Sequence, residues 1–528
     1  MDQRRLWLAI VLSIAVMLLY NVLVLPRYQT ARAPAGPTAP GGIPAPTTEN
    51  AAPEPAPVPE STPPTSALAA EPDESTPVTV DTDHFRLAFT PRGARLAGLE
   101  LKDFRRTVDP QSPPLDLVTP GSILPLTLQL GDESDARVTY TPDRTDLKLQ
   151  GAEQGDVVFT GAAPGGGTLE KRFHFSGDGY VFELRVKREG GPAAVGVGVV
   201  LTPIATAGTG GGRTPGQEQG VAFVDQKIVE KSLADLQKQP FLTDGAHWAG
   251  FTAQYFLTAI LPESGSGRTA MGVVDGTPIV RLDASGASAT FDVFAGPKDR
   301  DVLTSAGHDL GRALDFGWFW FIAIPLLRAL RILYGVTGNY GVAIIVLTAL
   351  VKLATTPLTQ TTFRNMREMQ KLQPQMARLR EKHKDDQMAL QKEMMELYKR
   401  HHVNPFAGCL PMVLQLPIFV GLYNTLLHSI ELRHAPFMLW INDLSAPDRL
   451  LVAGFGVPVL TLLMGASMFL QQWLSPQQGD PTQQRMMMIM PLMFTFMFMN
   501  FPAGLVLYWL VNNVLTIGQQ YMVVRSGS

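Results

Sequence analysis

Hydrophobic and polar positions follow two different patterns in two parts of the chain. Residues 80–310 contain short segments in which apolar and polar residues alternate, separated by Gly, Pro and Asp turns. Alternation with a period of two places every second side chain on one face of a strand, so a β-sandwich is predicted. Residues 340–524 contain long uncharged runs around one strongly charged segment. This second part is predicted to be a bundle of membrane-spanning helices.

The uncharged runs set the number of spanning helices. Three of them are about the length of one membrane crossing: 341–358, 407–430 and 451–474. The last run, 486–524, is too long for one helix, and turn-forming residues at 500–504 should divide it. The sequence therefore predicts five core helices. The piece at 486–499 would be about 21 Å long, shorter than a ~30 Å hydrocarbon core, and is expected to thin the bilayer.

The charged segment at 364–402 is predicted to be a cytoplasmic helical hairpin. It contains ten Lys or Arg and six Asp or Glu residues, and charges cluster at 382–386, where a turn is expected. An excess of Lys and Arg favours the cytoplasmic side. Apolar residues recur at helical spacing, which also suits a solvated coiled-coil-like hairpin without further function. Its methionines offer a soft surface for apolar clients, and the candidates are Met366, Met369, Met376, Met394 and Met395.

Three further segments complete the predicted topology. Residues 1–25 are basic and then uncharged, and the apolar run is longer than that of a cleaved signal peptide, so an uncleaved transmembrane anchor is predicted. Residues 26–79 are rich in Pro and Ala and are predicted to be a disordered linker. Residues 311–335 carry too short an uncharged run to span, and they are predicted to form a periplasmic amphipathic interfacial helix. Both termini are then cytoplasmic, and residues 525–528 form a short tail.

One lysine stands out in the first core helix. Lys352 is the only charged residue between Asn339 and Phe363. A charge on a membrane-crossing helix costs about 2.5–3.5 kcal/mol on insertion scales, so it marks a functional cavity by default. The alternative is a lysine whose ammonium reaches the headgroups. Thr348 lies four residues earlier, on the same helix face.

Composition excludes several other classes of function. The formal net charge is −3, so no basic field indicates nucleic-acid recognition. The single cysteine, Cys409, cannot form an intrachain disulfide, and no Cys/His cluster has metal-ligand spacing. The glycine-rich run at 208–213 lacks the Lys-Ser/Thr end of a phosphate-binding loop. No catalytic residues, cofactor or metal are predicted.

Several strings resemble the YidC–Oxa family of membrane protein insertases, in its Gram-negative form. They are TALVKLATTPLT (348–359), QKEMMELYKRHHVNPFAGCLPMVLQLPIF (391–419), ELRHAPFMLWINDLSAPD (431–448) and FPAGLVLYWLVNNVLTIGQQ (501–520). The resemblance implies a protein of the bacterial inner membrane that inserts and helps fold membrane proteins. It implies a hydrophilic groove open to cytoplasm and lipid, and no enzymatic activity.

The resemblance also assigns residues to this groove. Lys352 stands where the family usually has arginine, and Thr348 matches a groove threonine. Tyr508 and Trp509 match a Tyr-Tyr pair whose second member contacts the entering segment, and Gln415 is a further lining candidate.

The implied partners are nascent membrane proteins, the Sec translocon, the lipid bilayer and the translating ribosome. The ribosome is a weakened expectation because the tail at 525–528 is so short. Two other classes stay open. A small-solute transporter would use Lys352 as its substrate charge, but no inverted repeat is visible. A carbohydrate-active enzyme would need a carboxylate pair in the sandwich.

Overall fold

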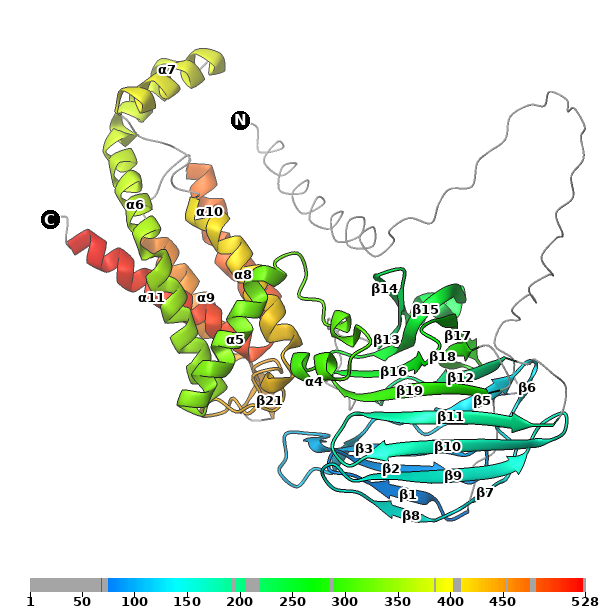
Figure 1. Ribbon diagram of the computed structural model, residues 1–528. Helices are drawn as coiled ribbons and strands as arrows, with labels where there is room; N and C mark the ends of the chain where they lie inside the picture. Colours follow the sequence, from blue (N-terminus) through cyan, green and yellow to red (C-terminus); the bar gives the residue numbers. More distant parts are fainter. Residues whose placement is uncertain are drawn as a thin grey trace, which may run out of the picture. The chain divides into compact units, whose positions relative to one another are not determined.

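The computed structural model describes residue 68 and residues 75–190, 196–205, 218–284, 288–383, 386–401, 410–452, 454–474 and 481–525. The predicted anchor at 1–25 and most of the linker lie outside these residues. The described part contains a β domain followed by a helical region (Figure 1).

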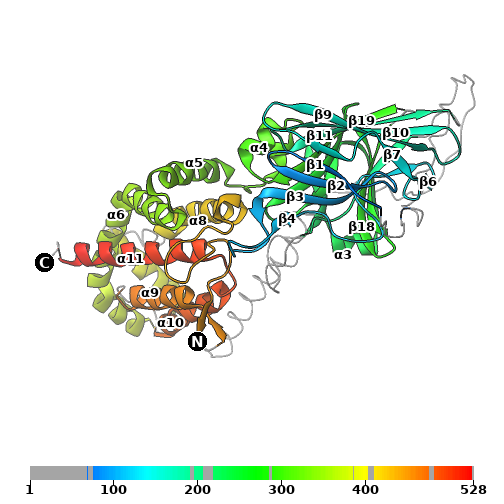
Figure 2. The same ribbon diagram turned by 90° about the horizontal axis from the view of Figure 1, so that it is seen from below.

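The β domain is built from two sheets that face each other, as predicted for a sandwich (Figure 2). The first sheet has the order β4-β3-β2-β1-β8, with bounds β1 (Val78–Asp81), β2 (Phe85–Thr90), β3 (Arg95–Arg105), β4 (Pro114–Asp116) and β8 (Asp146–Lys148). The second, larger sheet comprises β5 (Thr127–Leu130), β6 (Glu133–Ser134), β7 (Tyr140–Pro142), β9 (Gln154–Ala162), β10 (Thr168–Ser176), β11 (Val181–Glu189), β12 (Val197–Leu201), β13 (Gln219–Val224), β14 (Lys227–Ser232), β15 (Phe241–Thr252), β16 (Phe256–Pro262), β17 (Gly267–Val274), β18 (Thr277–Ala284) and β19 (Ser288–Pro297). Three short helices accompany the sheets: α3 (Leu233–Lys238), α4 (Arg300–Ser305) and η3 (Leu310–Ala313).

Strand β10 shows how alternation builds the core. Leu169 and Phe173 point inward and are fully buried. Phe173 packs on Phe89 of the opposite sheet, with ring centroids 4.7 Å apart. The same alternation carries Lys171 to the inside, between these two apolar residues.

The buried Lys171 is neutralised inside the sandwich. Its Nζ lies 2.6 Å from the Asp135 carboxylate and donates to the carbonyls of Gly93 and Leu126. The Tyr140 hydroxyl donates to the same carboxylate at 3.0 Å. Burial lowers the pKa of Lys171, and the neighbouring Asp135 opposes this shift. Loss of one partner would leave an uncompensated buried charge.

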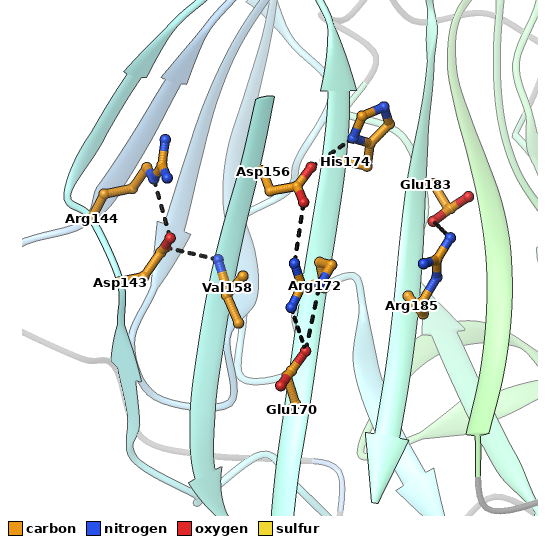
Figure 3. A network of polar contacts seen from close by, with 9 residues as sticks. All are labelled: Asp143, Arg144, Asp156, Val158, Glu170, Arg172, His174, Glu183 and Arg185. Carbon is orange, nitrogen blue, oxygen red and sulfur yellow. Dashed lines mark hydrogen bonds and ion pairs between the residues drawn. The ribbon is translucent and has the colours of Figure 1, made fainter. Parts of the chain in front are cut away.

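The outward residues of the same strands form a charged, solvated face (Figure 3). Arg172 bonds to Glu170 at 3.0 Å and to Asp156 at 3.3 Å, and Asp156 also accepts from His174. These pairs are partly exposed, and exposed pairs contribute little stability.

The helical region contains the following elements: α5 (Trp320–Thr337), α6 (Tyr340–Lys382), α7 (Gln387–Arg400), α8 (Leu410–His428), η5 (Ile430–Leu432), β20 (Leu450–Val452), β21 (Phe455–Val457), α9 (Val459–Leu474), α10 (Pro481–Phe498) and α11 (Ala503–Arg525). Helix α11 packs against α6, α8 and α9, and α5 packs against α6 and α8.

Two helices of the described part are long and apolar enough to cross a membrane by length and composition alone, namely Trp320–Thr337 and Tyr340–Pro357.

The first core helix does not end where the charged segment begins. Helix α6 runs without a break from Tyr340 to Lys382, so the apolar segment and the first hairpin arm are one helix. The predicted turn is present, because α7 starts at Gln387 with the Asp386 side chain accepting from the Ala389 amide.

The third uncharged run differs more strongly from its prediction. Strands β20 and β21 pair as an antiparallel hairpin, and α9 begins only at Val459. Uncharged composition cannot separate an apolar hairpin from the first turns of a helix. The predicted break at 500–504 is present between α10 and α11. Helix α10 begins at Pro481, so at about 27 Å it is longer than the predicted piece.

Helix α5 lies later in the chain than the predicted 311–335 segment. Asp315, Gly317 and the aromatic residues before Trp320 precede it as an irregular segment. Arg331, inside α5, forms 2.6 Å ion pairs with Asp299 and Glu431 and a third with Asp301. This arginine ties the helix to the end of the β domain and to the segment after α8.

Asp135→Asn should destabilise the β domain by about 3 kcal/mol, because it leaves Lys171 buried and unpaired. Pulse proteolysis of the purified full-length protein in urea measures this free energy of unfolding. Asp156→Asn is the matched control on the solvated face, where less than about 1 kcal/mol is expected. Equal losses in the two variants would contradict the assignment of Lys171 and Asp135 as a buried pair.

Candidate polar site between helices α6 and α11

A row of polar side chains on α6 faces a similar row on α11. Thr348, Lys352 and Thr356 are spaced four residues apart, so they lie on one face of α6. The α11 residues, spaced three or four apart and so also on one face, are Tyr508, Asn512, Thr516 and Gln519. We call these seven residues the polar stripe.

Lys352 joins the two rows. Its Nζ donates to the Thr516 hydroxyl at 2.7 Å and to the Asn512 amide oxygen at 3.3 Å. Both partners are neutral, so they satisfy donors of the ammonium without cancelling its charge. The arrangement retains a positive charge that an acidic ligand could still use.

The stripe continues toward the charged hairpin. Gln519 donates from Nε2 to the Thr356 hydroxyl at 2.7 Å. The Gln519 Oε1 is buried and has no hydrogen-bond partner within the part of the chain that the structure describes. An acceptor of this kind is available to an incoming N–H or to water.

Sequence reasoning missed Thr356, Asn512, Thr516 and Gln519. The signal was present in α11, where polar residues recur at intervals of three or four within an otherwise apolar helix. The recurring polar face could have been found by the same criterion that paired Thr348 with Lys352.

Tyr508 and Gln415, which were both predicted to line the groove, are in direct contact in the structure. The Gln415 Nε2 lies 2.6 Å from the Tyr508 hydroxyl, linking α8 to α11. Thr348 is buried and donates to the carbonyl of Ile344 on its own helix. Its hydroxyl is therefore occupied within α6.

Trp509 lies on a different face of α11 from the polar stripe. It packs in an aromatic cluster with Phe419 of α8 and Phe498 of α10, at centroid distances of 4.7 and 5.0 Å. The ring remains half-buried. Successive helix residues differ by about 100°, which separates Trp509 from its neighbour Tyr508.

The hairpin methionines divide into two groups. Met369 is buried with Leu372, and Met376 packs against them and accepts from the Tyr398 hydroxyl of α7 at 3.8 Å. Met394 is half-buried and Met395 is exposed. The side chain of Met366 lies outside the described residues. Met388, which sequence reasoning did not select, is the most exposed of the described hairpin methionines.

Two family profiles match consecutive parts of the chain. One, described as the YidC periplasmic domain, matches residues 77–329, and one, described as 60Kd inner membrane protein, matches residues 332–528. The boundary between them falls inside α5. The fold and these profiles define an inner-membrane protein with a periplasmic β domain.

Full-length relatives carry the same two parts. Membrane protein insertase YidC of Geobacter sulfurreducens is 41% identical over 84% of this chain and 86% of its own length. Membrane protein insertase YidC of Pelobacter propionicus is 38% identical over 99% of both chains. A solved structure of an active YidC insertase is 19% identical, covers 86% of this chain and 94% of its own, and has a TM-score of 0.38. The chain belongs to the YidC family of membrane protein insertases.

Cysteines placed at Thr356 and Gln519 should be joined efficiently by a short bis-thiol crosslinker, because these side chains touch. The background is Cys409→Ser, which removes the single native cysteine. A matched pair at Leu353 and Gln519 should not be joined, since Leu353 is 70% exposed on another face of α6. Gel mobility after crosslinking in isolated membranes provides the readout, and equal yields from both pairs would contradict the facing rows.

Proposed function

We propose that this chain inserts membrane proteins by receiving their short polar outer segments at the polar stripe. The observation that carries the proposal is Lys352, a cation held between α6 and α11 by the neutral side chains of Asn512 and Thr516, with no carboxylate partner among the described residues. Acidic residues of a client would be attracted to this charge. No bond is made or broken, so the protein acts as an insertase and chaperone and not as an enzyme.

The physical route follows from this placement. A hydrophilic groove along the stripe, open to cytoplasm and lipid, lowers the cost of bringing polar residues partway across the bilayer. The client's apolar segment then enters the lipid, with about 25 cal/mol gained per Å² of apolar surface buried. Helices α9 and α10 are about 24 and 27 Å long, shorter than a ~30 Å hydrocarbon core, so local thinning would shorten the route further.

The proposed topology places α6 and α8–α11 across the membrane and α5 on its periplasmic surface. Position 331 lies eleven residues after Trp320, about 16 Å along α5, yet Arg331 still pairs with Asp299 and Asp301 of the β domain. A crossing helix would carry this position into the hydrocarbon. With α5 on the surface, the hairpin at 364–402 is cytoplasmic, as its positive charge favours. The termini are then cytoplasmic as well.

Partners follow from the same topology. Nascent membrane proteins are the clients, and Met388, Met394 and Met395 of the hairpin are placed to meet their apolar segments. Cooperation with the Sec translocon is proposed for larger clients. Contact with the translating ribosome is proposed for the charged hairpin.

A cysteine replacing Lys384 should react with a membrane-impermeant thiol reagent only from the cytoplasmic side, in a Cys409→Ser background. A cysteine replacing Asp103 in the β domain is the control, and it should be labelled from the outside. Inside-out and right-side-out vesicles distinguish the two sides. Labelling of position 384 from outside would overturn the topology, including the surface position of α5.

Lys352→Arg should retain insertion, whereas Lys352→Ala and Lys352→Glu should impair clients with acidic outer segments. Loss of a few kcal/mol of attraction matters most for clients with weakly apolar membrane segments, because strongly apolar ones already partition well. The measurement is insertion of one client carrying zero to three acidic residues outside, assayed with each variant. Thr495→Ala on α10, outside the stripe, is the control for helix packing. Equal insertion of acidic and neutral clients by Lys352→Glu would show that the charge of Lys352 does not attract acidic client segments.

A further inference from the structure

A cavity of about 410 Å³ lies where α4, η3 and the start of α5 meet, away from the polar stripe. This volume is within the range of small-molecule sites. One part of its wall is polar, with Arg300, His308, Asp309 and Arg312. The other part is apolar and includes Phe316 and Ile324. Such a cavity suits a ligand with an anionic end and an apolar end.

Arg300 is the unsatisfied group of this cavity. Arg300 lines the cavity, and no ion pair of its guanidinium is found among the described residues. Its Nη1 is enclosed by protein and has no hydrogen-bond partner there. A guanidinium without a carboxylate partner leaves an uncompensated positive charge in the cavity wall, and such a charge is costly unless an anion pairs with it. The guanidinium fork is matched to phosphate or carboxylate oxygens.

The other charged groups at the cavity are already paired. Arg312 interacts with Asp309 at 3.4 Å, and His308 lies 3.3 Å from Asp292. The nearby Asp301 is held by Arg331. One uncompensated positive charge is therefore left, which fits a ligand with a single negative charge.

The apolar wall continues onto the surface of α5. Ile324 lies one helical turn after Trp320, on the same face. Trp320 and Phe321 are 59% and 56% exposed, and Trp318 just before the helix is 87% exposed. Tryptophan is enriched where proteins meet the headgroup level of a bilayer. A ligand held at Arg300 could thus extend along an aromatic surface of the kind that contacts lipid.

Resting on the proposed surface position of α5, we propose that this cavity binds one anionic phospholipid of the outer leaflet. The phosphodiester accepts from the Arg300 guanidinium, and the acyl chains leave past Ile324 and along Trp320. The bound lipid would fix α5 at the membrane surface beside the β domain. This binding site is separate from the polar stripe, so its test does not depend on insertion activity.

The test is native mass spectrometry of the purified full-length protein, titrated with phosphatidylglycerol, phosphatidylcholine or inorganic phosphate. Wild type should retain one phosphatidylglycerol more tightly than phosphatidylcholine. Arg300→Gln should weaken phosphatidylglycerol binding about tenfold, because a charge-assisted hydrogen bond is lost. Arg328→Gln removes an equal charge from an exposed position of α5 outside the cavity, and should change binding by less than about twofold.

Thermal unfolding separates a ligand site from a structural role. Without lipid, Arg300→Gln should unfold at nearly the wild-type temperature, and phosphatidylglycerol should raise this temperature for wild type only. Arg300→Lys should keep part of the lipid effect. Equal binding of the two lipids, equal weakening by Arg328→Gln, or a large loss of stability in lipid-free Arg300→Gln would each overturn the proposal. Inorganic phosphate that binds and stabilises as well as phosphatidylglycerol would assign the cavity to a free anion and also overturn it.

Discussion

The cost of one ammonium between apolar helices is the constraint on which the helical region depends. Lys352 can be kept there because Asn512 and Thr516 of α11 place two oxygen acceptors within hydrogen-bond distance of its Nζ. Neutral acceptors solvate the ammonium and leave its net charge available, whereas a carboxylate partner would have cancelled it. This retained charge is the reason why we propose the polar stripe as a site for negative charge.

The β domain also contains a buried lysine, but there a carboxylate neutralises the charge. Lys171 meets the Asp135 carboxylate inside the sandwich, so no charge is left to recruit a ligand. The two lysines differ in that a carboxylate cancels the charge of Lys171, whereas Lys352 is held by neutral side chains. Arg331 has a third role, because its ion pairs with Asp299 and Glu431 join α5 to the end of the β domain and to the segment after α8.

The sequence predicted the parts of the fold that composition and period determine. Alternating segments gave the sandwich, and the charge cluster before Gln387 gave the turn between α6 and α7. Residues 451–457 were assigned to a helix because an uncharged run looks alike in a hairpin and in a helix. Of the site, Lys352 was found because its charge is isolated, but its partners on α11 are ordinary polar residues. Their role depends on the packing of α6 against α11, which single-sequence patterns do not encode.

The most direct measurement is photo-crosslinking to a nascent acidic client during synthesis, from a probe at Asn512 and from a probe at Val514. Position 512 belongs to the polar stripe, and Val514 is 53% exposed on another face of α11. The account predicts that the client's polar outer segment is captured from position 512 and not from position 514. Capture of that segment from position 514 alone, or from both positions equally, would contradict a route along the polar stripe.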